Sequence, residues 1–481
     1  MEKMAGMIDN VAGVVDAILE RPDFAHSRIG IQIRDVRTSG ILYGLNADQF
    51  FAGASTTKLI TCAGALAALG PDSRFETGVF RTGEIDSSGV LHGDLVLVAS
   101  GDPNLSGRIC DDDTLEFHDT DHALAGYYPG TAPLVGAGKI FRDLANQIAS
   151  NKITRIRGSV VIDLSLFPEG DVEAGTHAVI SPVAVNDNLI DILVKGASAP
   201  GAPAELSFEP LASYARFVNT TRTTMLPDKR RPIEVAEGPL ESSTRVVEVR
   251  GEIAPGDSLH VAYRVSEPSR FAAAMLKDAL EEIGIAIDGV ALAENGDRSL
   301  VAMHRSPPLR EAVKVVLKVS QNLHAEMLLR LVRARGGAVF PFAPRTDAFQ
   351  GDGCGFKAHF TPNFMCEFLI AARKAPWAED LLHALPVLGH DGTLRNIQRD
   401  TRAASVKAVR AKTGTLSYSN VLDGGALMES KALAGFVSTA SGRELAFAIF
   451  FSNVPFADER EPDAIGNLVA SIAVAAYDSL S

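Results

Sequence analysis

Long hydrophobic runs, basic clusters and aromatic residues are all scarce in this 481-residue sequence. No stretch reaches the roughly 18 consecutive apolar residues that a membrane-spanning helix needs, so we expect no transmembrane segment. A single tryptophan, Trp377, and 6% aromatic residues disfavour a surface of stacking rings. The net charge is −13 and no Lys/Arg-rich stripe occurs, which predicts that nucleic acid is not a partner, because an acidic surface repels phosphate.

Cysteine is also rare, and its spacing excludes a disulfide scaffold. No pair has C-x-x-C spacing, and four cysteines in a chain of this length do not make a framework. Cys62 lies in an apolar run, which is typical of a small buried side chain, while a Cys354–Cys366 bridge stays open. The four are Cys62, Cys110, Cys354 and Cys366.

Metal-ligand patterns are missing as well. The eleven histidines show no H-E-x-x-H or paired-ligand spacing, so we predict no metal site. His324 and Glu326 are expected on a helix, packed or facing water, rather than on a metal.

The apolar periodicity predicts an α/β protein. Helical spacing is present at 8–21, 56–69, 270–283, 309–332 (broken near 320–322) and 463–479. Strand patterns are present at 28–36, 40–45, 94–99, 158–163, 189–194, 245–253, 408–415, 433–438 and 444–452.

The order of these elements indicates the domain organisation. A chain of this length is expected to form two or three domains. Strands at both ends flank helices, so the simplest arrangement is one sheet that combines N-terminal and C-terminal strands. We predict a discontinuous catalytic domain of residues 1–73 and 265–481. The mostly β region 74–264 is inserted in it as two small subdomains.

The first chemical motif is Ser55-Thr56-Thr57-Lys58, at the start of a predicted helix. Residues i and i+3 share a helix face, so the Lys58 amine is expected beside the Ser55 hydroxyl. A serine needs a base to become a nucleophile, and a lysine with a lowered pKa can act as one. The alternative is a helix cap with a solvated lysine, because so short a motif often arises by chance.

The second motif is Ser320-Gln321-Asn322, where one helical run gives way to the next. Its hydroxyl can relay a proton, and its amide can hold a substrate carbonyl. Ser and Asn also favour helix boundaries, so a plain helix cap is the alternative.

The third motif is Lys412-Thr413-Gly414-Thr415, on a predicted C-terminal strand. A cation and two hydroxyls can grip a substrate carboxylate, while Gly414 lets the ligand lie against the backbone. An edge strand protected by a lysine is the alternative reading.

The three motifs follow the order S-x-x-K, S-x-N and K-T-G that marks penicillin-recognising enzymes. Each one also lies in the expected element: helix start, inter-helix turn and strand. Further matches are Gly101-Asp102-Pro103, Gly158–Asp163, Asn186-Asp187-Asn188, Asp391-Gly392-Thr393-Leu394, Leu433–Phe436 and Ser452-Asn453.

With these motifs the sequence resembles the low-molecular-mass class C penicillin-binding proteins, which are D-alanyl-D-alanine carboxypeptidases and endopeptidases. The resemblance spans roughly residues 28 to 475. It implies the penicillin-recognising serine transferase fold, an antiparallel sheet flanked by helices, with a large mostly β insertion. Gln321 stands where Asp is common, at a position that points away from the substrate in the family. The frequent D-G-S-G-L of the family reads Asp352-Gly353-Cys354-Gly355-Phe356 here.

The resemblance also implies residue roles. Ser55 attacks the carbonyl of the penultimate D-alanine, and Lys58 is the expected base. Ser320 relays a proton to the leaving amine and Asn322 holds the acyl-side amide. The terminal carboxylate is bound by Lys412, Thr413 and Thr415, with Gly414 between the threonines. No metal or organic cofactor is needed.

The partners implied are a peptidoglycan stem peptide, or a related D-amino-acid peptide, and β-lactams as covalent inhibitors. The family acts in the periplasm or otherwise outside the cytoplasm. The N-terminus lacks a basic segment followed by a clean apolar one, so no signal peptide is visible and a cytoplasmic location stays open. Two alternatives remain: an intracellular amidase, peptidase or esterase of the same fold, and a catalytically silent penicillin-binding-like protein.

Overall fold

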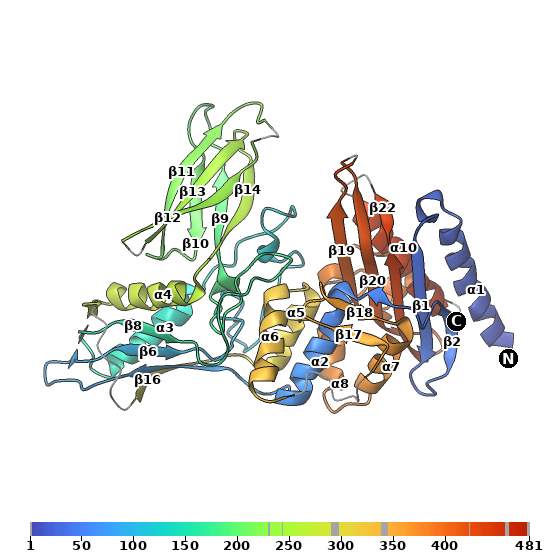
Figure 1. Cartoon of the computed structure of the whole chain (residues 1–481), viewed down its shortest axis with the longest axis horizontal. Coiled ribbons are helices and arrows are strands. Elements are labelled where there is room, and N and C mark those ends of the chain that lie inside the picture. The colour runs from blue at the N-terminus through green and yellow to red at the C-terminus, as the bar shows by residue number, and fades with distance from the viewer. Residues whose placement is uncertain are drawn as a thin grey trace. The chain divides into compact units, whose positions relative to one another are not determined.

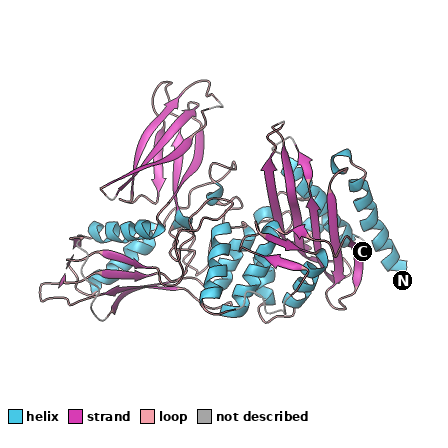
Figure 2. Cartoon of the chain, in the orientation of Figure 1, coloured by secondary structure: helices cyan, strands magenta, loops and turns pink. Residues whose placement is uncertain are grey.

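The computed structural model describes residues 2–228, 231–242, 244–289, 298–337, 345–422, 424–456 and 461–478. The chain divides into two compact units, which we treat separately. Unit 1 comprises residues 1–72 and 309–481, and unit 2 comprises residues 73–308. Figure 1 shows their elements along the chain, and Figure 2 shows the mixture of helices and strands in both.

Unit 1 is built on an antiparallel sheet with the strand order β19-β20-β21-β1-β2, and β22 pairs with β20. The sheet joins strands from the two ends of the sequence, as predicted. A second, small sheet has the order β17-β18-β3. The strands are β1 (Arg28–Asp35), β2 (Ile41–Leu45), β3 (Phe51–Ala52), β17 (Ala348–Gln350), β18 (Ala358–Phe360), β19 (Val409–Ser419), β20 (Ala426–Ser438), β21 (Glu444–Ser452) and β22 (Val454–Phe456).

Helices cover both faces of the large sheet. One core joins the sheet to α1 and α10, and α7 packs on β1 and β21. Helix α2 contacts α5 and α6, and α5 contacts α8. The helices of unit 1 are α1 (Glu2–Leu19), η1 (Pro22–Phe24), η2 (Ala54–Thr56), α2 (Thr57–Leu69), α5 (Leu309–Lys318), α6 (Asn322–Ala334), α7 (Pro362–Ala372), α8 (Ala378–Ala384), η5 (Gly392–Leu394), α9 (Arg402–Ser405) and α10 (Glu461–Asp478).

The described residues of unit 2 form four small sheets with the orders β16-β4-β6-β8, β15-β7-β5, β10-β9-β14 and β11-β13-β12. Its strands are β4 (Glu76–Arg81), β5 (Val90–Leu91), β6 (Leu95–Val98), β7 (Arg155–Ile156), β8 (Val160–Asp163), β9 (Leu189–Lys195), β10 (Glu205–Glu209), β11 (Ala215–Thr223), β12 (Glu234–Glu241), β13 (Thr244–Ile253), β14 (Ser258–Arg264), β15 (Ala286–Ile287) and β16 (Ser299–Arg305). Its helices are η3 (His122–Leu124), α3 (Gly138–Ser150), η4 (Asn186–Asn188) and α4 (Pro268–Glu282).

The predicted helices and strands are present, most of them within a few residues of their expected bounds; α1 and β20 begin earlier than expected, at Glu2 and Ala426. The sequence analysis missed α3 in the mostly β region. This helix buries Ile140, Phe141, Leu144 and Ile148. Their helical spacing is the signal that could have found it.

The segment 265–308, which we predicted to be part of the catalytic domain, packs with unit 2 instead. It forms α4, β15 and β16, which contact α3, β7 and β4 of unit 2. Phe271 and Leu276 of α4 lie in the core of that unit, so the apolar face of α4 holds the segment there. The predicted catalytic boundary at 265 therefore differs from the boundary of the compact units at 309.

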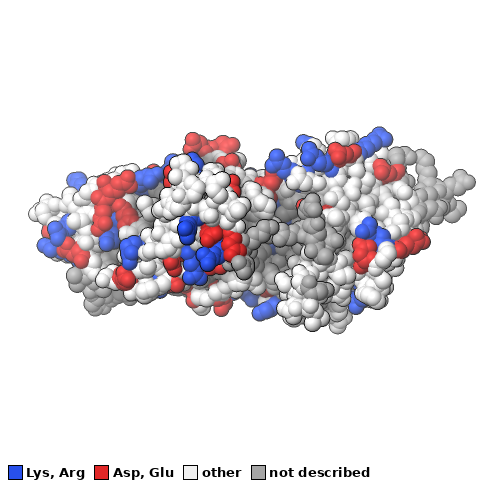
Figure 3. Space-filling model, turned by 90° about the horizontal axis from the view of Figure 1, so that it is seen from above, with Lys and Arg blue, Asp and Glu red and all other residues white. Residues whose placement is uncertain are grey.

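Three further observations concern the surface charge, the cysteines and membrane-spanning helices. On the face drawn in Figure 3, basic and acidic side chains of the described residues lie interspersed. No disulfide joins Cys354 to Cys366, so the bridge that the sequence left open is not formed. Among the described residues, none of the helices is both long and apolar enough to cross a membrane.

Candidate active site

Ser55 lies in the short turn η2 that leads from β3 into α2. Ala54 adopts a left-handed backbone with φ 43°, which is uncommon for a residue with a Cβ and stores strain. Thr56 Oγ1 donates to the carbonyl of Gly53 at 2.6 Å and closes the turn. Ser55 is half-buried whereas its neighbours are buried, so the turn leaves Ser55 partly accessible to solvent.

Lys58 lies one turn further on and is fully buried in α2. Its Nζ atom donates to Ser55 Oγ at 2.7 Å, to Ser320 Oγ at 3.2 Å and to Asn322 Oδ1 at 2.5 Å. The i and i+3 spacing brings Lys58 to Ser55, as expected. The packing of α2 against α5 and α6 brings the second motif to the same amine.

Ser320 and Asn322 occupy the junction between α5 and α6. Ser320 has φ 63°, so the chain turns sharply between the two helices. The Gln321 side chain accepts a hydrogen bond from the His324 backbone N–H at 3.3 Å and caps α6. Gln321 thus caps the helix, while Ser320 and Asn322 accept hydrogen bonds from Lys58.

Lys412 comes from β19 and is also fully buried. Its Nζ atom donates to Ser320 Oγ at 2.9 Å and to the carbonyl of Thr413 at 2.9 Å. Burial, reinforced by the nearby charge of Lys58, lowers the pKa of Lys412 well below its ordinary value. Ser320 Oγ therefore joins the amines of the first and third motifs.

Gly414 allows β19 to lie against the serine turn. A Cβ atom at this position would stand 3.1 Å from the Gly53 carbonyl oxygen and 3.2 Å from the Ala54 Cβ. Both distances are tight, so a side chain would push the strand away from the turn. Thr413 Oγ1 donates to Thr393 Oγ1 at 2.8 Å, and Thr415 is exposed. The eight residues predicted for the site thus come from elements that meet around Ser55.

The sequence analysis did not predict the groups that fix the position of the serine turn. Glu326 accepts hydrogen bonds from the backbone N–H groups of Gly353 (2.6 Å) and Cys354 (3.1 Å). Thr61 of α2 donates to the Gly353 carbonyl at 2.8 Å. Gly355 lies directly against the Ala54 carbonyl, where any Cβ would collide. The 352–356 stretch, noted above only for its sequence drift, therefore clamps the serine turn.

A second support lies behind Ser320. Lys318 Nζ donates to Asp391 Oδ2 at 2.7 Å and to the Leu385 carbonyl at 2.7 Å. Burial lowers the pKa of Lys318, and Asp391 opposes the shift. Because Thr393 follows Asp391 closely and bonds Thr413, this pair ties the α5–α6 junction to β19. The signal in the sequence was the Asp391–Leu394 motif, which gave no role.

Two groups of side chains have the composition of a metal site among the described residues. Glu326, Asp352 and Cys354 form the first. Their carboxylates already accept backbone N–H groups, from Gly353 to Glu326 and from Gly355 to Asp352 (2.7 Å). Burial raises the pKa of Asp352, which weakens it as an anionic ligand.

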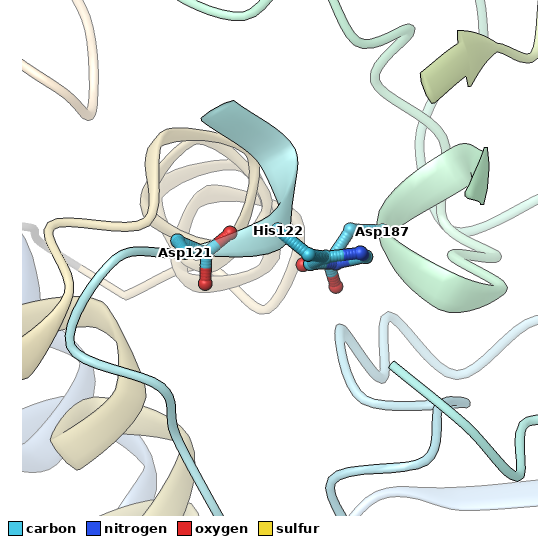
Figure 4. A group of neighbouring side chains, drawn as sticks. All are labelled: Asp121, His122 and Asp187. Carbon is cyan, nitrogen blue, oxygen red and sulfur yellow. The ribbon is translucent and has the colours of Figure 1, made fainter. Parts of the chain in front are cut away.

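The second group is Asp121, His122 and Asp187 in unit 2, drawn in Figure 4. Arg108 Nη2 donates to Asp121 at 2.7 Å and to Asp187 at 2.9 Å. His122 bonds Asp187 through Nε2 at 2.8 Å and Asp191 through Nδ1 at 3.0 Å. Although burial opposes it, the carboxylates of Asp191 and Asp187 raise the pKa of His122 to about 10. Two cations already compensate these carboxylates, so the group forms a buried ion network. The sequence gave no spacing signal for it, and we assign no metal to either group.

Comparisons with known proteins extend over nearly the whole chain. The D-alanyl-D-alanine carboxypeptidase of Actinomadura sp. (strain R39) is 28% identical over 485 residues, which cover 90% of this chain and 79% of that protein. The D-alanyl-D-alanine carboxypeptidase DacB of Haemophilus influenzae is 24% identical, with 90% and 87% covered.

Solved structures give the same fold. The crystal structure of penicillin binding protein 4 (dacB) from Haemophilus influenzae covers 97% of this chain and is itself covered to 99%, with a TM-score of 0.71 and 21% identity. This likeness confirms the predicted fold class. The model of the D-Ala-D-Ala carboxypeptidase 3 (S13) family matches residues 11–474. The chain therefore belongs to the D-Ala-D-Ala carboxypeptidase 3 (S13) family.

Proposed function

We propose that the chain is a serine DD-carboxypeptidase that cleaves D-alanyl-D-alanine termini of peptidoglycan stem peptides through a Ser55 acyl-enzyme. The observation that carries this proposal is the bridge from Ser55 through Lys58 and Ser320 to Lys412. A serine hydroxyl acts as a nucleophile when an adjacent base can take its proton, and a buried amine beside it can be that base.

The acylation step uses the pair Ser55 and Lys58. Lys58, in its neutral form, takes the proton from Ser55 Oγ as this oxygen attacks the carbonyl carbon of the penultimate D-alanine. Lys58 is fully buried, and burial, together with the charge of Lys58, lowers the pKa of the nearby Lys412. The backbone N–H groups of Ser55 and Thr415 stabilise the negative oxygen that forms.

The leaving group needs a proton, and Ser320 supplies it. Ser320 Oγ lies between the two amines, at 3.2 Å from Lys58 Nζ and 2.9 Å from Lys412 Nζ. The proton taken from Ser55 passes from Lys58 through Ser320 to the D-alanine nitrogen as the C–N bond breaks. Asn322 holds the acyl-side amide, and it is oriented by Lys58.

Recognition of the terminal carboxylate falls to the third motif. We assign the carboxylate to Lys412 and to the Thr413 and Thr415 hydroxyls; Thr413 is half-buried and Thr415 is exposed. Gly414 gives the peptide room to lie along the strand. Water then attacks the acyl-enzyme, gives its proton to Lys58 and releases the shortened peptide, while Ser55 regains its proton.

The finer parts of the proposal concern partners and place of action. A peptidoglycan substrate implies action outside the cytoplasm, on stem peptides and also on their cross-links, with β-lactams as covalent inhibitors. Membership of a carboxypeptidase family favours this function over an intracellular amidase or esterase. The three motifs are complete in the sequence, which argues against a silent protein.

The test is intact mass after incubation with benzylpenicillin, for the native chain and for Ser55→Ala. We expect one covalent adduct on the native chain and none on the variant. Ser417→Ala is the matched control, because it removes an exposed serine hydroxyl from the far part of β19, and this variant should keep the adduct. An unmodified native chain would contradict the proposed function.

A further inference from the structure

A second lysine lies next to β19, on the neighbouring strand. Lys431 of β20 is the direct cross-strand partner of Thr415. Its Nζ atom donates to Thr415 Oγ1 at 3.0 Å. Cross-strand partners project to the same face of a sheet. Lys431 is therefore tied to the hydroxyl that the proposed function assigns to the terminal carboxylate.

The direction of this bond matters for the chemistry. An ammonium group only donates, whereas a hydroxyl both donates and accepts. Thr415 Oγ1 accepts from Lys431, so its own O–H hydrogen is left to point at another acceptor. The ammonium carries further N–H groups beyond the one bound to Thr415. Hydroxyl and ammonium together form a donor pair suited to a carboxylate.

Lys412 does not offer the same contact. It is fully buried, and its ammonium bonds Ser320 and the Thr413 carbonyl. Lys431 is half-buried and its partner Thr415 is exposed. A carboxylate that reaches Thr415 from solvent therefore meets Lys431 as the adjacent cation.

The Lys431 side chain also packs against a glycine that leaves room for it. It lies over Gly466 of α10, where a Cβ atom would stand 3.2 Å from Lys431 Cε and 3.7 Å from Nζ. Glycine at this place leaves room for the lysine stem. Burial lowers the pKa of Lys431 to about 8, and the charge of Asp463 in the first turn of α10 opposes that shift. The group is thus still mostly charged at neutral pH.

We propose that Lys431 is a specificity-determining residue which, with Thr415, binds the free C-terminal carboxylate of the substrate and favours terminal over internal peptide bonds. This inference rests on the proposed function. A terminal D-alanine carries a full negative charge that pairs with the ammonium. The corresponding group in an internal peptide bond is a neutral amide, which gains much less from a cation.

The experiment compares two peptides that differ only at this group: an N-acetylated peptide ending in D-Ala-D-Ala, and the same peptide with a C-terminal amide. Both are hydrolysed by the native chain, by Lys431→Met, by Lys431→Arg and by the control Lys374→Met, which removes an exposed lysine after α7. For Lys431→Met we expect kcat/KM on the acid to fall about 10- to 100-fold, mostly through KM, and kcat/KM on the amide to change less than about threefold. Lys431→Arg should restore most of the preference, and Lys374→Met should keep it.

A second measurement does not depend on peptide turnover. The acylation rate of Ser55 is measured with benzylpenicillin and with its methyl ester, which lacks the carboxylate charge. Lys431→Met should reduce the rate with the acid and leave the rate with the ester near the native value. A native-like rate with the ester also shows that the variant is folded.

The outcomes separate the two proposals. If the native chain forms no adduct and hydrolyses neither peptide, the proposed function fails, and this inference fails with it. If the native chain is active but Lys431→Met lowers the rates for charged and neutral substrates equally, or changes neither, the function stands and the role of Lys431 is overturned.

Discussion

Two buried clusters in this molecule hold cations whose pKa values shift in opposite directions. In unit 1, Lys412 is bonded to a hydroxyl and a carbonyl, and burial lowers its pKa. In unit 2, His122 is bonded to Asp187 and Asp191, and these carboxylates raise its pKa to about 10 although burial opposes them. Desolvation penalises both cations, so the difference comes from the compensating charge.

The comparison distinguishes a buried cation that takes part in catalysis from one that stabilises the fold. A buried amine with neutral hydrogen-bond partners gives up its proton more readily than a solvated lysine does, which suits catalysis. A buried imidazole between two carboxylates stays protonated and holds chain segments together. Accordingly, the first cluster contacts the half-buried Ser55, whereas Arg108, His122, Asp187 and Asp191 are each nearly inaccessible.

The largest expected effect comes from removing the uncompensated cation. Lys412→Met should lower the Ser55 acylation rate by benzylpenicillin about 100- to 1000-fold, because Ser320 loses one of its two amine partners. The same change should leave the unfolding midpoint in urea unchanged or raised, since a buried charge is replaced by an apolar side chain of similar length. Stopped-flow acylation and urea unfolding measure the two effects. A native-like acylation rate would contradict the assigned role of Lys412.

The compensated network should respond in the opposite way. Arg108→Met removes the cation that Asp121 and Asp187 share in the interior and should cost roughly 3 kcal/mol of unfolding free energy. Arg216→Met is the matched control, because the exposed Arg216–Glu241 pair should contribute less than about 1 kcal/mol. Urea unfolding measures both. At temperatures where the variant stays folded, its Ser55 acylation rate should match the native rate, and a large loss there would remove the distinction between the clusters.

A third expected effect is a pH dependence of stability. The pKa of His122 is raised from about 6.5 to about 10, so the folded state binds a proton that the unfolded state releases above pH 6.5. Stabilisation from this group is therefore complete below about pH 6.5 and is lost as the pH rises toward 10. The free energy of unfolding, measured in urea between pH 6 and 10, should fall less steeply in His122→Gln than in the native chain. Equal slopes would show that His122 does not carry the proton.

The catalytic motifs and the elements that carry them could be predicted from the sequence because their signals are local. The i and i+3 spacing of Ser55 and Lys58, the helix boundary at Ser320 and the strand at Lys412 are each readable within a few residues. The predicted joining of N-terminal and C-terminal strands into one sheet followed from their order, and it is confirmed. Helix α3 was not predicted, although its buried residues have helical spacing. The packing of 265–308 on unit 2 was not predicted either, because contacts between distant segments leave no local pattern in the sequence.

The sequence by itself determined the three motifs, the elements that carry them and the family resemblance, because periodicity and short spacing are properties of neighbouring residues. Only the tertiary structure decided which distant groups share a site: the 352–356 clamp on the serine turn, the Lys318–Asp391 tie and the place of Lys431 beside Thr415. Strand register and helix packing set those distances. They depend on how side chains fill space between segments that are not neighbours in the sequence, which no local pattern encodes.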